Sequence, residues 1–293
     1  MPISRDRLRE LFGMRHRGVN LYTRSSTEQD GYVIENIELL IDNEHVRGIV
    51  TRPAAPGRHP AILYGHSHGG RYDIGAQELL AGRDYLLDPL GPVFARQGYV
   101  TLCIDMPIFG LRATQTESAR AKALLWYDRA LICEMLADHQ AALTYLISRE
   151  DVDHSRVGAF GMSMGCFLSY WLAAVDERIA AVAHLCCFAD LRSMVRSGAH
   201  DGHGVYLVVP GLLDEADAGA IGALIAPRPQ LVCIGEADRL TPVDAFELAW
   251  HEMSMSYAGY GTLEQLREPG VGHQETPRMR EAVLDFFART LKR

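Results

Sequence analysis

The sequence predicts an α/β fold, in which helices cover both faces of a mostly parallel central sheet of about eight strands. The first observation is that apolar segments of strand length alternate with segments of helical periodicity after residue 60. Secondly, the interior strands are uniformly apolar, which is typical of parallel strands buried on both faces. Thirdly, polar residues follow several apolar segments directly, where strands of such a sheet place their ligand-binding ends.

The helices and strands are expected in a definite order. Before residue 60 we expect a charged amphipathic helix at 4–16, a polar loop at 17–30, and an antiparallel hairpin of strands 32–41 and 45–51. Later strands are expected at residues 60–64, 99–104, 157–161, 179–186, 229–235 and 262–267. Helices are expected at residues 75–97 with breaks at Gly82 and near Pro89, at 119–148, directly after Ser163, at 241–253 and at 277–291.

A single domain over residues 1–293 is expected, because the sequence has no internal repeat, low-complexity linker or composition break. Residues 1–30 are expected to be an N-terminal helical extension. Residues 188–226 are irregular and contain several glycines and bulky apolar side chains, so we expect a small lid or pocket insertion there. An ordinary connection between a strand and a helix remains the alternative for this kind of segment.

Composition limits the classes of function. The net charge of −8 and the lack of a basic run argue against binding to nucleic acid or to an anionic membrane. No segment is apolar for long enough to span a bilayer, and the N-terminus lacks a signal-peptide core, so we expect a cytoplasmic protein. The six cysteines lie in apolar runs without Cys-x-x-Cys spacing, which favours buried thiols over disulfides or a metal site.

One motif combines a strand, a tight turn and a helix. The strand at 157–161 runs into Gly161-Met162-Ser163-Met164-Gly165, and an apolar helical pattern follows at once. Glycines on both sides of Ser163 allow the backbone to turn sharply and to pass close to its neighbours. Such a turn places the serine hydroxyl above the edge of the sheet, beside the first N–H groups of the helix.

The chain holds a second Gly-x-Ser-x-Gly match at residues 65–69, so the motif alone does not select a serine. Ser67 follows the third predicted strand, and Ser163 follows the fifth, with a βαβ unit on each side. On these grounds the sequence resembles the α/β-hydrolases, with Ser163 as the nucleophile. In that family the triad order is serine, acid, histidine, and the resemblance assigns these roles to Ser163, Asp238 and His273. It also makes the loop His66–Gly70 part of the oxyanion hole.

At finer grain, three segments resemble the dienelactone-hydrolase-like and acetyl-xylan-esterase-like branch: residues 142–157, 224–229 and 238–242. Dienelactone hydrolases themselves carry cysteine where this chain has Ser163, which argues against their lactone substrate. The resemblance implies that backbone N–H groups of Met164 and of His68, or alternatively Ser67, hold the oxyanion.

Several residues offer alternatives to these roles. Each of the three triad candidates also has an ordinary structural interpretation. Ser163 and Asp238 could each cap a helix, and His273 could be a histidine of a surface loop. Asp190 and Glu236 are rival acids for the triad. His66, His68, His200 and His203 have spacings seen in zinc sites, but no cysteine or carboxylate cluster completes a set, so no metal and no cofactor is predicted. His184, within an apolar strand, and Cys166, after Ser163, are expected to be core residues.

The sequence therefore predicts a serine hydrolase that cleaves a small-molecule carboxylic ester through an acyl-enzyme. Two alternatives remain: a peptidase or amidase similar to prolyl oligopeptidases, without their propeller, and a catalytically silent homologue that binds a ligand. Neither nucleic acid nor membrane is an expected partner. The helix at 4–16 and the hairpin at 32–51 are surfaces through which a homo-oligomer could form.

Overall fold

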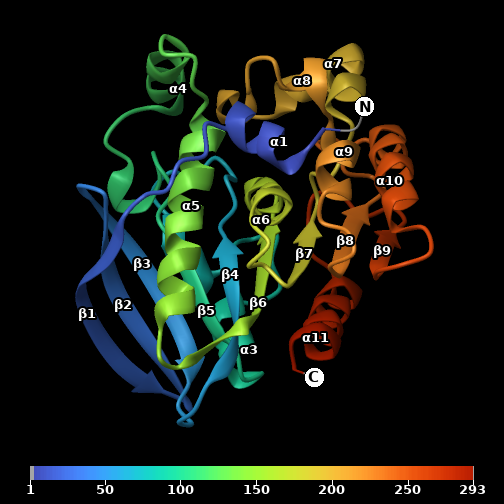
Figure 1. Ribbon diagram of the computed structural model, residues 1–293. Helices are drawn as coiled ribbons and strands as arrows, with labels where there is room; N and C mark the ends of the chain where they lie inside the picture. The colour runs from blue at the N-terminus through green and yellow to red at the C-terminus, as the bar shows by residue number, and fades with distance from the viewer. Residues whose placement is uncertain (1–2, 293) are drawn as a thin grey trace.

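The computed structural model describes residues 3–292, which are organised around one mixed sheet (Figure 1). Across this sheet the strand order is β1-β2-β3-β5-β4-β6-β7-β8-β9. In this spatial order, the pairs β1–β2, β2–β3 and β3–β5 are antiparallel. The pairs β5–β4, β4–β6, β6–β7, β7–β8 and β8–β9 are parallel. The strands are β1 (Val19–Gln29), β2 (Tyr32–Ile41), β3 (Glu44–Pro53), β4 (His59–Gly65), β5 (Val100–Ile104), β6 (Val152–Met162), β7 (Ala181–Leu185), β8 (Gln230–Gly235) and β9 (Leu263–Glu268). The two ends of the predicted domain, residues 1–2 and 293, lie outside the described residues.

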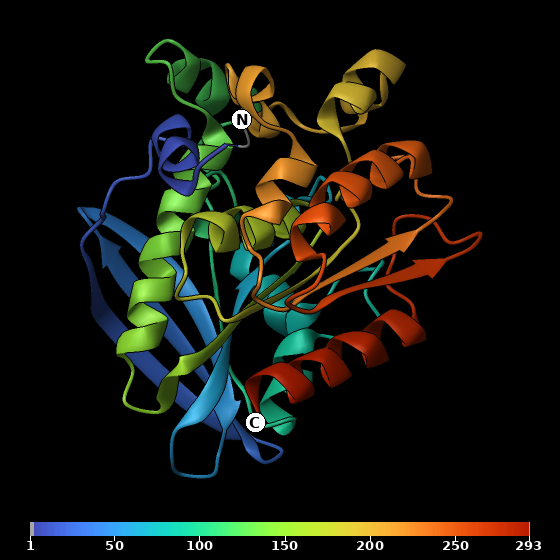
Figure 2. The same cartoon turned by 45° about the vertical axis from the view of Figure 1, so that its right-hand side comes forward.

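Helices cover both faces of the sheet, as the sequence predicts (Figures 1 and 2). One apolar layer lies under α1 (Arg5–Leu11), α5 (Leu131–Ser148), α6 (Met164–Val175), α9 (Ala218–Ala223) and α10 (Val243–Tyr257). The opposite layer lies under α2 (Glu78–Ala81), α3 (Leu90–Arg96) and α11 (Pro277–Leu291). Every residue of α6 is buried, because this helix packs beneath the other helices of its layer.

The register of the parallel strands brings their carboxyl ends to one edge of the sheet. Gly65 at the end of β4 pairs with Gly161 in β6, and Met162 at the end of β6 pairs with Leu185 at the end of β7. The loops that follow these strands therefore start side by side. In Figure 1, α4 (Glu117–Leu125), α7 (Leu191–Ser197) and α8 (Leu212–Glu215) lie beyond the arrowheads at this edge.

Two expectations for the N-terminal region were wrong in part. The predicted helix is shorter, because α1 ends at Leu11. Residues 17–30, expected as a loop, contain strand β1, which extends the predicted hairpin and makes the sheet nine-stranded. Nearly every residue of β1 is exposed, so this edge strand has no buried face and its sequence lacks apolar alternation. Ser67 and Ser163 consequently follow the fourth and sixth strands.

The long helix predicted at 119–148 is two helices, α4 and α5. The break contains Asp128 with a φ of 54°, a left-handed conformation that no α-helix continues. Trp126 and Tyr127 beside it are 88% and 79% exposed, so their apolar character does not report burial here. The hairpin and the remaining predicted strands are confirmed, with ends displaced by a few residues at most, apart from the strand of Ser163, which begins earlier, at Val152.

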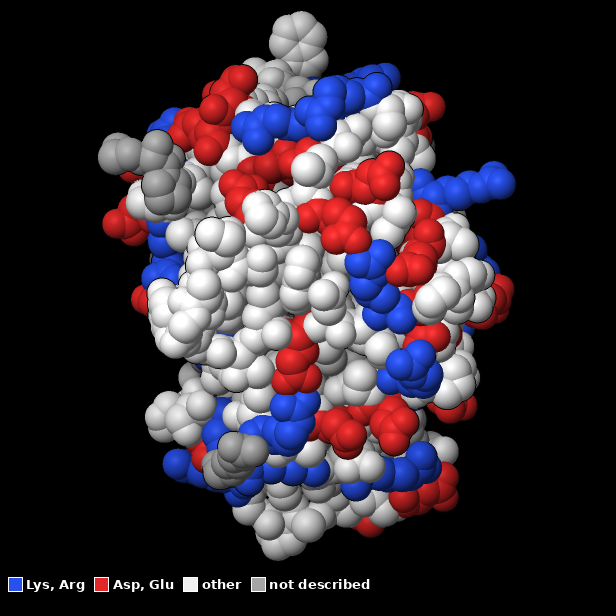
Figure 3. Space-filling model, turned by 90° about the vertical axis from the view of Figure 1, so that its right-hand side faces the viewer, with Lys and Arg blue, Asp and Glu red and all other residues white. Residues whose placement is uncertain are grey.

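The segment 188–226 is largely helical rather than irregular. It holds α7, two short 3₁₀ turns (Ala199–Gly202 and Val205–Leu207), α8 and α9. Among residues 3–292, no helix is both long enough and apolar enough to cross a membrane. On the face in Figure 3, basic and acidic side chains are interspersed around an uncharged centre, so this face has no continuous basic surface.

Candidate active site

Ser163 stands at the apex of a tight turn between β6 and α6. Its φ of 59° and ψ of −120° lie outside the regions that L-residues commonly adopt, and such strain is concentrated at functional sites. A Cβ atom on Gly161 would collide with the backbone of Gly165, and one on Gly165 would collide with the carbonyl oxygen of Gly65. The flanking glycines are therefore required by close packing of three backbone segments, and the turn presents the Ser163 side chain at the sheet edge.

His273 and Asp238 are brought together from the loops after β9 and β8. Nδ1 of His273 lies 2.7 Å from Oδ2 of Asp238. The Asp238 side chain is only 1% exposed, whereas that of His273 is 20% exposed. The other carboxylate oxygen, Oδ1, accepts a hydrogen bond from the N–H of Leu240 at 2.8 Å. With Nδ1 donating to the carboxylate, Nε2 of His273 is left as the proton acceptor.

The loop that carries His273 is fixed at both ends. The N–H of Ala237 donates to the carbonyl of Val271 at 2.8 Å, which ties this loop to the one that carries Asp238. On the other side, the N–H of Glu275 donates to the carbonyl of Tyr85 at 2.8 Å. These bonds hold the imidazole in place without burying it.

Ser163 and His273 line the same pocket, whose volume is about 210 Å³. The remaining lining residues come from the loop after β4 and from the segment after α7: His68, Gly69, Gly70, Tyr85, Gly202, His203, Gly204, Tyr206 and Leu240. The structure thus places the three predicted triad residues at one edge of the sheet. Asp238 and His273 are hydrogen-bonded to each other, and Ser163 and His273 line the same pocket.

The rival acids are engaged elsewhere. Oδ1 of Asp190 accepts the N–H of Ser193 at 2.6 Å and so caps helix α7. Glu236 forms an ion pair with Arg267 at 2.6 Å. Asp238 is the carboxylate that contacts His273 among the described residues.

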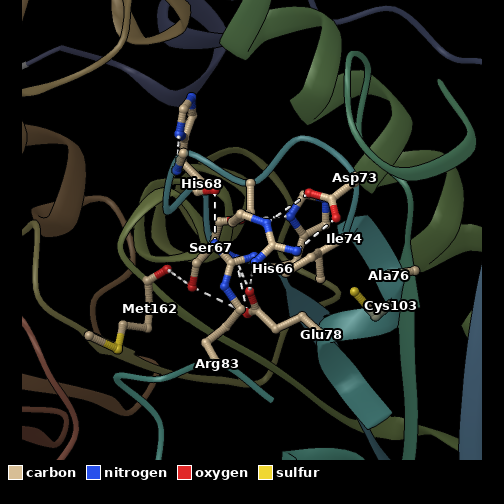
Figure 4. A network of polar contacts seen from close by, with 12 residues as sticks. His66, Ser67, His68, Asp73, Ile74, Ala76, Glu78, Arg83, Cys103 and Met162 are labelled. Atoms are coloured by element: carbon tan, nitrogen blue, oxygen red, sulfur yellow. Dashed lines mark hydrogen bonds and ion pairs between the residues drawn. The ribbon is translucent and has the colours of Figure 1, made fainter. Parts of the chain in front are cut away.

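Ser67 does not compete with Ser163 for the pocket. It is fully buried, and its hydroxyl lies 3.2 Å from both Oε1 of Glu78 and the carbonyl oxygen of Met162 (Figure 4). Its backbone N–H donates to the two carboxylate oxygens of Glu78 at 3.0 and 3.1 Å. The Ser67 N–H is therefore already engaged by Glu78, which favours His68 over Ser67 as the predicted oxyanion donor of this loop.

Glu78 and Arg83 hold the loop His66–Gly70 in position through hydrogen bonds to its backbone. Glu78 is fully buried, and burial raises the pKa of its carboxyl although Arg83 lies 3.6 Å away. Nη2 of Arg83 also donates to the carbonyl oxygen of His68 at 3.1 Å. The backbone N–H of His68 donates to no oxygen within residues 3–292. The first N–H groups of α6, beginning at Met164, have no partner inside the helix, so both predicted donors remain available.

A second buried carboxylate, Glu117, connects the loop His66–Gly70 to the segment that contains Tyr206. Oε2 of Glu117 lies 2.8 Å from Nε2 of His68 and 2.7 Å from the hydroxyl of Tyr72. Oε1 accepts the backbone N–H of Tyr206 at 2.8 Å, and the Tyr206 ring stacks on His68 at 5.2 Å. Burial alone would raise the pKa of Glu117, but these hydrogen bonds outweigh it and the pKa lies below its ordinary value.

Sequence reasoning missed Glu117, Glu78 and Arg83. Each lies in a segment predicted as loop or helix and carries no motif, and its partner in the loop is 11 to 49 residues away. A buried charge is a signal that only the tertiary structure reveals.

The histidines considered as metal ligands contact different partners and do not converge on one point. His66 is buried, which lowers its pKa to about 4, and its Nδ1 lies 3.0 Å from the carbonyl of Ser67. His200 and His203 approach different backbone carbonyls, those of Met194 at 3.4 Å and Leu240 at 2.8 Å. Within residues 3–292, one group of three candidate ligands lies together: Cys186, Asp238 and His273. Two of its members, Asp238 and His273, are already hydrogen-bonded to each other at 2.7 Å.

His184 and Cys166 are core residues, as predicted. Nδ1 of His184 lies 3.3 Å from Sγ of Cys166, and its Nε2 lies 3.0 Å from Nε2 of Gln230. Burial lowers the pKa of His184 to about 3 and raises that of the Cys166 thiol well above its ordinary value. Neither group is suited to proton transfer at neutral pH.

Comparison with known proteins identifies the family. The model of the dienelactone hydrolase family matches residues 87–192. The Bacillus subtilis (strain 168) protein named "Putative hydrolase YtaP" is 35% identical over 280 residues, which cover 94% of each chain. The chain belongs to the dienelactone hydrolase family. Membership of this family identifies the chain as a carboxylic ester hydrolase.

Solved structures share the α/β-hydrolase fold of this dienelactone hydrolase family member at low identity. Methylesterase BT1017 superimposes with a TM-score of 0.72 at 24% identity, covering 98% of this chain and 62% of its own. A glucuronoyl esterase from Solibacter usitatus gives 0.71 at 17% identity, covering 98% and 92%. The acetyl xylan esterase from Paenibacillus sp. R4 gives 0.69 at 18% identity, covering 98% and 93%. The predicted fold class is confirmed.

Proposed function

We propose that this ester hydrolase acts through a Ser163-His273-Asp238 triad and an acyl-enzyme intermediate. The observation that carries the proposal is the 2.7 Å contact between His273 and buried Asp238, beside a pocket that Ser163 also lines. A serine hydroxyl is a weak nucleophile until a neighbouring base accepts its proton. Of the three histidines that line the pocket, His68 and His203 have their Nε2 atoms at Glu117 and at the carbonyl of Leu240. His273 is the candidate base, because its Nδ1 contacts Asp238 and its Nε2 is left as an acceptor.

The first half of the reaction forms the acyl-enzyme. Oγ of Ser163 attacks the ester carbonyl carbon while Nε2 of His273 takes its proton, and Asp238 stabilises the resulting imidazolium. The negative charge that develops on the carbonyl oxygen is held by the N–H groups of His68 and Met164. When the tetrahedral intermediate collapses, the ester C–O bond breaks and His273 returns the proton to the departing alcohol.

The second half uses water in place of the serine. Nε2 of His273 takes a proton from water, the hydroxide attacks the acyl carbon, and the same N–H groups hold the second oxyanion. Collapse then releases the carboxylic acid and returns the proton to Ser163 Oγ.

Hydrolysis of p-nitrophenyl acetate by the wild type, Ser163→Ala and Ser67→Ala tests the proposal. Loss of a triad nucleophile lowers kcat by about 10⁴-fold or more, so Ser163→Ala is expected to lose measurable turnover. Ser67→Ala is expected to stay within about tenfold of the wild type, since Glu78 and Met162 occupy its hydroxyl. Full activity of Ser163→Ala would refute the proposal. Faster cleavage of p-nitroacetanilide than of the ester would favour an amidase instead.

A reducing, cytoplasmic location belongs to the same proposal. It is supported by the six cysteines, all of which are buried and unpaired in the described structure.

A further inference from the structure

A second cavity, here called the lid cavity, lies beside the Ser163 pocket within residues 191–213. Its volume is about 530 Å³, which is more than twice that of the pocket itself. Its walls are mainly aliphatic side chains from α7, α8 and the turns between them. They are Leu191, Met194, Val195, Val205, Leu207, Val208, Val209, Leu212 and Leu213. Polar groups enter at one side, from His200, Asp201 and His203.

The lid cavity and the Ser163 pocket have a common border. His203 and Gly204 line both of them. Nε2 of His203 lies 2.8 Å from the carbonyl oxygen of Leu240, and a Cβ on Gly204 would collide with the carboxylate of Glu117. The border is therefore a segment of the chain that is held on both sides, by Leu240 and by Glu117. A substrate bound at Ser163 needs to extend only past this segment to reach the aliphatic walls.

Three valines in the wall of the lid cavity are exposed to solvent, so this apolar surface is accessible from outside. Val195, Val205 and Val208 are 50%, 38% and 54% exposed. A concave apolar surface of this size is typical of a small-molecule site, since such sites have volumes of about 300–1,000 Å³. Its shared border with the Ser163 pocket points to part of the substrate as the occupant, because a docked protein segment would require no such border with the reacting serine.

We propose that the lid cavity binds an apolar alkyl or aryl group of the ester, so that esters with a medium-length chain are better substrates than short ones. This inference rests on the proposed function. A buried methylene group contributes about fourfold in binding, and kcat/KM is expected to rise by about that factor for each methylene that enters the cavity. The group belongs either to the acid or to the alcohol part of the ester, and the experiment separates the two.

The experiment measures kcat/KM for two series of esters. One series varies the acid, from p-nitrophenyl acetate to the octanoate, and the other varies the alcohol, from methyl acetate to octyl acetate. A rise in the first series assigns the lid cavity to the acyl chain, and a rise in the second assigns it to the alcohol. If kcat/KM is flat in both series, the proposal is overturned.

Variants connect the chain-length effect to the cavity. Val208→Trp and Val205→Trp place an indole in the cavity from its exposed side, where the risk of misfolding is low. Each is expected to lower kcat/KM for the preferred long ester by tenfold or more while p-nitrophenyl acetate stays within about twofold. Leu248→Trp, at a 49% exposed position on α10 outside the cavity lining, is the matched control.

The outcomes separate this proposal from the one on which it rests. If the wild type hydrolyses p-nitrophenyl acetate but Val208→Trp and Val205→Trp both keep the wild-type chain-length dependence, the lid-cavity proposal is wrong and the triad stands. If the wild type hydrolyses no ester, the proposed function fails first. Isothermal titration of Ser163→Ala with p-nitrophenyl octanoate then still tests binding, and equal affinity in Ser163→Ala and its double variant with Val208→Trp would overturn the cavity assignment.

Discussion

The carboxylate of Asp238 and the imidazole of His273 lie 2.7 Å apart, although 35 residues separate them in the sequence. Neighbouring strands β8 and β9 supply the two loops, and their parallel pairing places both loops at the same edge of the sheet. Because the carboxylate is buried and the imidazole is partly exposed, the pair combines a fixed charge with an accessible base. This relationship predicts how the enzyme responds to removal of the charge.

Asp238→Asn is expected to lower kcat by about 10⁴-fold. An amide at this position no longer stabilises the imidazolium and allows the wrong tautomer of His273. Glu236→Gln is the matched control and is expected to stay within about twofold, since Glu236 pairs with Arg267 instead. Steady-state hydrolysis of p-nitrophenyl acetate measures both. An unchanged kcat in Asp238→Asn would show that Asp238 is not the triad acid.

Glu117→Gln is expected to lower kcat by about 10- to 100-fold with a smaller effect on KM. The carboxylate accepts from His68 and Tyr72 at one oxygen and from the Tyr206 N–H at the other. An amide has a single acceptor oxygen, so its NH2 group must face a donor on one of these two sides, and the donor at His68 loses its fixed position. Exposed Glu150 provides the control substitution Glu150→Gln. A purely structural role would lower the melting temperature and leave kcat of the folded enzyme unchanged, which would contradict the prediction.

His139→Leu is expected to stabilise the protein. His139 is fully buried and neither ring nitrogen has a partner among the described residues, so the polar ring costs about 1–3 kcal/mol. Burial also lowers its pKa to about 3. Below pH 6.5 the unfolded chain therefore takes up a proton that the folded chain refuses, and stability falls as the pH falls towards 3, by about 1.4 kcal/mol per pH unit.

Urea unfolding at pH 7 and pH 5 measures this effect. His139→Leu is expected to lose less stability between the two pH values than the wild type does. His154→Leu, at an exposed position, is the control. Identical pH dependence in His139→Leu and the wild type would contradict the assignment of a depressed pKa to His139.

Gly165→Ala is expected to lower the free energy of unfolding by about 3 kcal/mol, because overpacking at a rigid contact forces backbone shifts. The new Cβ would meet the carbonyl oxygen of Gly65, at the start of the oxyanion loop. Gly272→Ala provides a comparison for stability, since a Cβ there meets no atom within 4 Å. If urea unfolding gave equal stabilities for the two variants, the close contact between α6 and β4 would be in doubt.

The sequence was most informative where burial and local pattern agree. The apolar parts of strands β4 to β8 and the turn at Ser163 could be predicted because strands buried on both faces are mostly apolar, and a tight turn needs glycines. Strand β1 could not, since an exposed edge strand has no apolar face to leave a periodic pattern. The helix expected at 119–148 breaks at Asp128, and the sequence contains no sign of this break because apolar residues beside it, Trp126 and Tyr127, lie in solvent.

For the candidate site, residues with a motif or a fixed chain order could be named in advance, namely Ser163, Asp238 and His273. Glu78 and Glu117 could not, because their importance comes from long-range contacts with the loop at His66–Gly70. The choice between Ser67 and His68 as the oxyanion donor also required coordinates, since it depends on which N–H group Glu78 takes.

Labelling with a fluorophosphonate shows directly whether His273 activates Ser163, because the probe reacts covalently with a serine only when a neighbouring base activates it. We expect one label per chain in the intact-protein mass, located on Ser163 by peptide mapping and lost in Ser163→Ala and His273→Ala. A wild-type protein that takes up no label, or that carries it on Ser67, would contradict the assignment of Ser163 as the activated nucleophile.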